Sequence, residues 1–95
     1  MAKVTVKLFG VLKVDTRLGA SEIDVDTVEG IFGVLNTKVD EIFEARVKEN
    51  PRLVHPDKLD FKDALVFING ERCSKKKTKL NEGDEIWLLS PASGG

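Results

Sequence analysis

Side chains that commonly catalyse reactions or hold metal ions are scarce in this chain. Its 95 residues include one cysteine, Cys73, and one histidine, His55. A single thiol excludes an internal disulfide, and one imidazole with one thiol does not form a metal site unless carboxylates help. His55 stands in the proline-flanked sequence VHPD, without a recognisable partner for a Ser-His-Asp arrangement. We therefore expect no metal site and no catalytic activity of its own.

Nucleotide, nucleic-acid and membrane binding are disfavoured on similar grounds. No glycine-rich phosphate loop of the pattern G-x-x-x-x-G-K-[ST] occurs, and a formal net charge of -1 is unlike the basic balance of a general nucleic-acid binder. No apolar run approaches the ~20 residues that a membrane helix needs. The N-terminal sequence MAKVTVKLFGV leads directly into a strand pattern and lacks the features of a signal peptide. We expect a cytoplasmic protein with no bound cofactor.

Two segments near the N-terminus show the two-residue alternation of half-buried strands. In residues 3–11, valines and a leucine at every second position share one face. In residues 21–28, Ile23 and Val25 point inward and aspartates alternate with them. Because glycine and polar residues between the segments favour a turn, the two strands are expected to form a hairpin.

Apolar residues then recur every three or four positions, as on one face of an amphipathic helix. They are Val28, Ile31, Phe32, Leu35, Val39, Ile42, Phe43 and Val47. Asp26 or Thr27 is a candidate N-cap, the Asn36-Thr37 pair could divide the helix in two, and the Asn50-Pro51 pair ends it. Residues 51–63 include two prolines and are predicted to form a long loop with at most one short helical turn.

The C-terminal third contains three more strand segments. Residues 64–70, ALVFING, end in Asn-Gly, which is the strongest two-residue hairpin pattern. A short polar strand follows, and a last strand is predicted over residues 85–90 after a turn. Pro91 ends that strand. The remaining sequence, ASGG, has nothing large to bury and is expected to project into solvent.

The resulting order is strand, strand, helix, strand, short strand, strand. Strands interrupted by one long helix predict an α+β domain, in which a mixed sheet packs on one main helix. This is the order of the ubiquitin-like β-grasp fold, which implies that the first and last strands are parallel in the centre of the sheet. It also implies that the strand beginning LVFING lies beside the last. We predict a β-grasp domain over residues 1–91 and a flexible, reactive tail over residues 92–95.

The C-terminal half resembles the MoaD/ThiS family of ubiquitin-like sulfur carriers, and within it the small subunits of molybdopterin synthase. The residues that carry the resemblance are the VFING hairpin, the LNEGDEIW turn and strand, and the ending SPASGG. The N-terminal half matches in element order, and KVTVKLFG is similar to the family's first strand. The chain departs from the family in a longer segment over residues 49–63 and in GVLKVDTRLGA, which lacks a common Leu-Arg-Glu pattern.

The resemblance implies a carrier protein, not an enzyme, and this carrier is activated and loaded with sulfur at its C-terminus. A ubiquitin-activating-type partner would use ATP to adenylate the Gly95 carboxylate, and a sulfur donor of the cysteine desulfurase or rhodanese type would convert it to a thiocarboxylate. As the non-catalytic small subunit of molybdopterin synthase, the chain would then pass sulfur to a pterin precursor held with the large subunit, for a molybdenum or tungsten cofactor. Gly94, Ser93, Ala92 and Pro91 would insert the tail into partner active sites, because small residues fit a narrow channel.

Partner binding is predicted on the sheet face away from the helix. If the alternating aliphatic residues face the helix, Phe9, Phe67, Trp87 and Leu89 share the opposite face, which has no second layer in this fold. A cluster of exposed aromatic residues on an open sheet marks a partner site. The alternatives are that the loop over residues 51–63 covers these side chains or that the two faces are reversed.

Other functions stay open at the level of the sequence. The carrier could serve thiamine thiazole synthesis or tRNA thiolation, or it could be a modifier that forms isopeptide bonds through Gly95. The tail could also be inert, which would leave a simple interaction domain. The basic run at residues 75–79 is expected to be a solvated hairpin or a charged edge that deters aggregation, and Cys73 an ordinary thiol.

Overall fold

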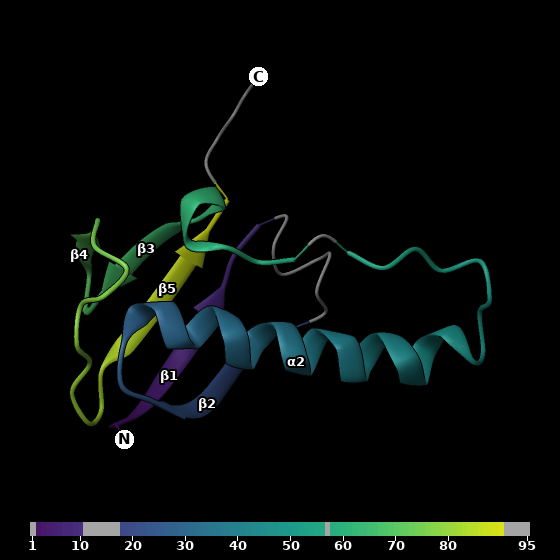
Figure 1. Cartoon of the computed structure of the whole chain (residues 1–95), viewed down its shortest axis with the longest axis horizontal. Coiled ribbons are helices and arrows are strands. Elements are labelled where there is room, and N and C mark those ends of the chain that lie inside the picture. Colours follow the sequence, from purple (N-terminus) through teal and green to yellow (C-terminus); the bar gives the residue numbers. More distant parts are fainter. Residues whose placement is uncertain (1, 11–17, 57, 91–95) are drawn as a thin grey trace.

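The computed structural model describes residues 2–10, 18–56 and 58–90. It contains strands β1 (Ala2–Leu8) and β2 (Ala20–Val25), helix α2 (Val28–Val47), the 3-10 helix η1 (Phe61–Asp63), and strands β3 (Leu65–Ile68), β4 (Glu71–Cys73) and β5 (Glu85–Leu89). The predicted order of elements is confirmed (Figure 1). The first strand is shorter than its alternation predicted, because Gly10 has a φ of 61° and turns the chain.

The strands form one mixed sheet in the order β2-β1-β5-β3-β4. Strands β1 and β2 form the predicted antiparallel hairpin, with Val4 opposite Ile23. Strand β5 pairs parallel with β1 on one side and antiparallel with β3 on the other. The first and last strands are therefore parallel neighbours in the centre, and the predicted α+β architecture of a ubiquitin-like β-grasp is confirmed.

The core lies between the sheet and helix α2. Val6, Ile86 and Leu88 on the sheet are 0% exposed, as are Ile31 and Leu35 on the helix. Fully burying side chains of this size contributes about 1.5–3 kcal/mol each relative to leaving them exposed. The prediction that the alternating aliphatic residues of the sheet face the helix is confirmed. The alternative, in which the aromatic residues would face the helix, is wrong.

Helix α2 begins at a conventional cap. Thr27 has an extended backbone with a φ of -135°, and its hydroxyl oxygen accepts a hydrogen bond from the Gly30 amide. Gly30 also lies close to Val25, because a Cβ at this position would sit 3.6 Å from the Val25 Cβ. Of the two predicted N-cap candidates, Asp26 and Thr27, the structure shows that Thr27 is the N-cap. The first turn of the helix packs closely against the end of β2.

The helix continues for 20 residues without interruption. Division at Asn36-Thr37 was a wrong expectation, because Thr37 donates its hydroxyl proton to the Gly33 carbonyl at 3.2 Å and leaves the helical backbone intact. The last helical residue is Val47, three positions before the predicted end at Asn50-Pro51. A hydrogen bond from the Asn50 amide to the Arg46 carbonyl forms a turn there instead.

The segment after α2 runs back alongside the helix (Figure 1). The Asn36 side-chain amide exchanges two hydrogen bonds with the Leu59 backbone, at 2.8 and 2.9 Å. The Phe61 ring meets Phe32 edge to face, with centroids 6.2 Å apart. The single helical turn predicted in this segment is η1. Its described residues contact α2, so the expectation that this loop might cover the open face of the sheet is wrong.

Candidate partner-docking site

The open face of the sheet carries the predicted aromatic patch, which we define as Phe9, Phe67, Trp87 and Leu89. Trp87 lies at its centre, paired with Phe67 across β3 and β5. The ring of Phe9 meets Trp87 edge to face, with centroids 6.0 Å apart. Phe9 is 40% exposed, and the other three are half-buried. The patch is therefore apolar surface that no described part of the chain covers with a second layer.

Leu65 extends the patch toward the end of the sheet. It pairs with Leu89 in the last registered position between β3 and β5, and it is half-buried. Ser90, the last described residue, follows Leu89 directly. The chain thus reaches its C-terminal residues from the central strand of the sheet, beside the apolar patch. Pro91, Ala92, Ser93, Gly94 and Gly95 lie outside the described residues, so their predicted roles stay predictions.

Two charged residues organise the patch, and sequence reasoning missed both. Glu85 Oε1 accepts a hydrogen bond from the Trp87 indole N–H at 2.8 Å. The same oxygen lies 2.9 Å from the Lys7 ammonium. The indole bond and then Lys7 hold the pKa of the Glu85 carboxyl below its ordinary value. A signal was available, because Glu85 and Trp87 are two residues apart on one strand and so share a face.

The family-like motifs at the other end of β5 form a polar anchor. Asp84 is buried, and its carboxylate accepts hydrogen bonds from the Asn69 side-chain amide at 2.9 Å and from the Asn81 backbone at 2.8 Å. The Asn69 side-chain oxygen in turn accepts from the Glu85 amide at 2.9 Å. This anchor ties the β3–β4 turn to the start of β5, which explains physically why the ING and GDE sequences occur together.

Left-handed backbone shapes the same two turns. Asn69 and Gly70 have φ values of 51° and 89°, as a two-residue hairpin with both central residues at positive φ requires. Gly83 has a φ of 86°, and its amide donates to the Lys3 carbonyl at 2.8 Å. The predicted Asn-Gly hairpin is confirmed, and the turn before β5 is joined to β1.

The basic run has a structural role through its backbone. The carbonyls of Lys76 and Thr78 accept hydrogen bonds from the first two amides of α2, at 2.7 and 3.0 Å. These amides have no partner inside the helix. The lysine side chains are exposed, which agrees with a solvated turn, and Lys76 lies 3.8 Å from Glu29.

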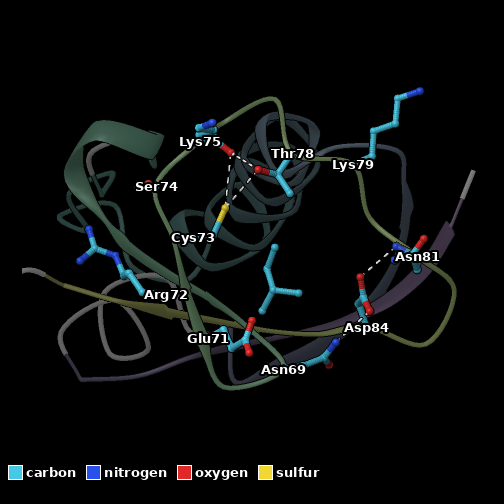
Figure 2. A pocket seen from close by; sticks show the side chains of 11 residues that line it. Asn69, Glu71, Arg72, Cys73, Ser74, Lys75, Thr78, Lys79, Asn81 and Asp84 are labelled. Carbon is cyan, nitrogen blue, oxygen red and sulfur yellow. Dashed lines mark hydrogen bonds between the residues drawn. The ribbon is translucent and has the colours of Figure 1, made fainter.

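A hollow of about 590 Å³ lies between this run and β4 (Figure 2). Cys73 is one of its lining residues and is itself buried. Its sulfur lies 3.4 Å from the Lys75 carbonyl and 3.5 Å from the Thr78 hydroxyl oxygen. The thiol is packed inside the turn, and its expected lack of special reactivity stays a prediction. Over residues 2–10, 18–56 and 58–90, no group of three or more His, Cys, Asp or Glu side chains is placed to hold a metal ion.

His55 is held by two acceptors, although the sequence offered it no visible partner. Its Nε2 lies 2.7 Å from an Asp40 carboxylate oxygen, and its Nδ1 lies 2.6 Å from the Pro56 carbonyl oxygen. The ring also packs against Phe43, with centroids 4.6 Å apart. The Pro56 carbonyl and then Asp40 raise the pKa of His55 above its ordinary value. His55 therefore fixes the loop to α2.

No helix in the described part of the chain is long and apolar enough to cross a membrane. The mixed sheet, with helix α2 over one face and an open apolar face on the other side, is the fold of small ubiquitin-like proteins. The ThiS family profile matches residues 6–95, and the chain belongs to this family.

Solved structures agree with this class. The small archaeal modifier protein 1 from Methanosarcina acetivorans is 26% identical, with a TM-score of 0.70 over 100% of this chain and 98% of its own. A protein assigned as molybdopterin converting factor subunit 1 from Pyrococcus furiosus is 20% identical, with a TM-score of 0.64 over 96% of this chain and 99% of its own. No curated protein matches by sequence.

A third similar structure is a complex. It contains subunits 1 and 2 of the molybdopterin-converting factor from Helicobacter pylori, with 19% identity and a TM-score of 0.51 over 98% of this chain and 99% of that one. At this identity the likeness concerns the fold. It shows that a protein of this shape is found in a two-subunit assembly.

Proposed function

We propose that this protein is a sulfur carrier whose C-terminal Gly95 is converted to a thiocarboxylate. The observation that supports the proposal most directly is the sequence SPASGG placed immediately after β5, the central strand that carries Trp87 and Leu89 on the open face. The ThiS family match extends to Gly95. A partner that binds the apolar patch would therefore hold the start of the tail beside its own active site.

The chemistry needs no catalytic side chain on this chain. A carboxylate oxygen of Gly95 attacks the α-phosphorus of ATP on an adenylating partner and releases pyrophosphate. A persulfide from a cysteine desulfurase or rhodanese-type donor then attacks the acyl carbon and releases AMP, and a thiol reduces the resulting acyl disulfide to the thiocarboxylate. The reacting atoms belong to the main chain, and glycine without a Cβ suits a tail that must enter a narrow channel.

We propose molybdopterin synthesis as the pathway, with this chain as the non-catalytic small subunit and a larger subunit as its partner. The SPASGG ending and the likeness to two proteins described as molybdopterin-converting factor subunits support this choice. Carriers for thiamine thiazole synthesis or for tRNA thiolation are the alternatives. Addition of the thiocarboxylated protein and a large subunit to a sulfur-free pterin precursor tests the choice, because dithiolene product forms only if this pathway is correct.

Intact-mass spectrometry tests the carrier proposal itself. The untagged protein is incubated with ATP, the adenylating enzyme of the same organism and a persulfide donor with a thiol reductant. The expected product gains the mass difference of one sulfur for one oxygen, located at Gly95 by fragmentation. A variant without Gly95 is the matched control and stays unchanged. The activity of the adenylating enzyme is verified with a carrier protein that it is known to adenylate. If that enzyme is active and the mass of the full chain stays unchanged, the proposal is overturned.

A protein-modifier function is the second candidate. It is favoured by the 26% identity and the TM-score of 0.70 with a small archaeal modifier protein. In that case Gly95 would form isopeptide bonds with lysine side chains of other proteins. Tryptic peptides with a lysine carrying this chain's C-terminal residues would support it, and they would be absent from cells that express the chain without Gly95.

A further inference from the structure

The indole N–H at the centre of the aromatic patch already has its hydrogen-bond acceptor within the chain. The indole N–H of Trp87 donates to Glu85, whose same oxygen contacts the Lys7 ammonium. A buried donor without a partner would cost binding free energy. Because Trp87 brings its own acceptor, a partner can cover the indole with apolar surface, while the partly exposed Lys7 and Glu85 head groups stay at the edge of that contact.

One charge at the edge of the patch has no such partner. Arg72 lies opposite Phe67 in the register of β3 and β4, so the two side chains share the open face. It is exposed, and the described residues give it no ion pair. In Figure 2 its guanidinium points away from Asn81 and Asp84 on the other side of the hollow. A planar guanidinium beside an apolar surface suits a carboxylate at an interface.

The apolar face extends to the point where the described chain ends, at Ser90. Leu65 and Leu89 bring the apolar surface to the end of the sheet where Ser90 leads into the C-terminal residues. Aromatic and arginine side chains dominate the binding energy of many interfaces, with apolar centres and polar rims. The open face has the same arrangement, with Trp87 at its apolar centre and Arg72 at its polar rim.

We propose that the open face binds a protein surface that is apolar opposite Trp87 and carries a carboxylate opposite Arg72, and that Glu85 is a positioning residue which prepares Trp87 for burial. This inference rests on the proposed carrier function and specifies the surface of the adenylating partner. A second copy of this chain is the other conceivable occupant, and self-association of the purified protein through Trp87 would overturn the proposal.

Affinity for the adenylating enzyme tests the carboxylate. We expect the Arg72→Glu variant to bind at least ~10-fold more weakly than the wild type, because a rim guanidinium is replaced by a repelling charge. Lys77→Glu is the matched control, since it makes the same charge change on the turn next to the helix, and it should bind like the wild type. Equal binding by the two variants would overturn the proposal.

Zero-length cross-linking locates the carboxylate directly. In the Arg72→Lys variant, a carbodiimide should join the new ammonium to an acidic residue of the partner, and mass spectrometry should identify the linked peptides. Cross-links from other lysines with none from position 72 would contradict the proposal. A protein that gains sulfur at Gly95 yet shows no effect at Arg72 refutes this inference alone. A protein that neither binds the enzyme nor gains sulfur refutes the carrier function with it.

The positioning role of Glu85 has its own measurement. Gln retains the acceptor oxygen for the Trp87 indole, whereas Ala removes it. We therefore expect Glu85→Ala to weaken binding by about 10-fold and Glu85→Gln to recover most of the loss. The indole proton resonance of Trp87 should move in the Ala variant before any partner is added. Equal binding by both variants would exclude the positioning role.

Discussion

The two faces of one sheet use apolar residues for different purposes. On the covered face, Leu88 and Ile86 are 0% exposed and pack under helix α2. On the open face, Trp87 and Leu89 alternate with them and stay half-buried. The covered side chains are aliphatic and need no polar partner, whereas Trp87 is fixed by Glu85. Neighbouring positions on β5 thus separate folding from binding by the side on which each residue lies.

Truncation of adjacent leucines gives the sharpest test of this difference. We expect Leu88→Ala to lower the free energy of unfolding by about 2–5 kcal/mol, because it leaves a cavity in the core. Leu89→Ala should lower it by less than about 1 kcal/mol, because solvent and neighbours can adjust around an open face. Chemical denaturation measures both values. Equal losses would show that the open face is as much a part of the core as the covered one.

Removal of the polar anchor at the start of β5 should have the next largest effect. Asp84→Ala leaves the Asn81 amide and the Asn69 side chain without their acceptor. We expect a loss of about 1–3 kcal/mol in the free energy of unfolding. Glu71→Ala is a suitable control, because Glu71 lines the same hollow but is exposed. Similar denaturation midpoints for the two variants would contradict the anchor.

The N-cap of helix α2 offers a test of the helix that covers one face of the sheet. Thr27→Ala removes the hydroxyl that accepts from Gly30, and the expected loss is about 1 kcal/mol. Thr27→Ser keeps an accepting oxygen and should restore most of the stability. Thermal and chemical denaturation of the three proteins provide the comparison. An Ala variant as stable as the wild type would mean that the 76–78 turn alone holds the start of the helix.

The smallest expected effect concerns His55, which contacts Asp40 and Phe43 of α2. Both ring nitrogens face acceptors, so the protonated imidazolium fits the site best. Since the folded pKa is raised from 6.5, the stabilisation is fully present below pH 6.5 and is lost as the pH rises through the raised pKa. An NMR titration should show that raised pKa in the wild type and a lower one in Asp40→Asn. Identical titrations would contradict the contact.

Much of this fold could be predicted because its local patterns agree with its final environment. The two-residue alternation in β1 and β5 separated the residues of the two faces, although it left open which face is covered, and Asn69-Gly70 identified the hairpin. The loop contacts could not be predicted in the same way. Asn36 resembles a helix-breaking residue in sequence, but in the folded protein its amide binds the Leu59 backbone. Hydrogen bonds between residues 23 positions apart leave no periodic pattern.

The sequence by itself determined the element order, the division of the sheet into two apolar faces and the Gly-Gly ending, because each depends on neighbouring residues along the chain. Only the tertiary structure decided that the long loop packs on α2 instead of the patch, that the basic run caps the helix, and that Lys7, Glu85 and Trp87 form one network. These outcomes depend on β1 and β5 being parallel neighbours and on which distant groups satisfy one another's hydrogen bonds.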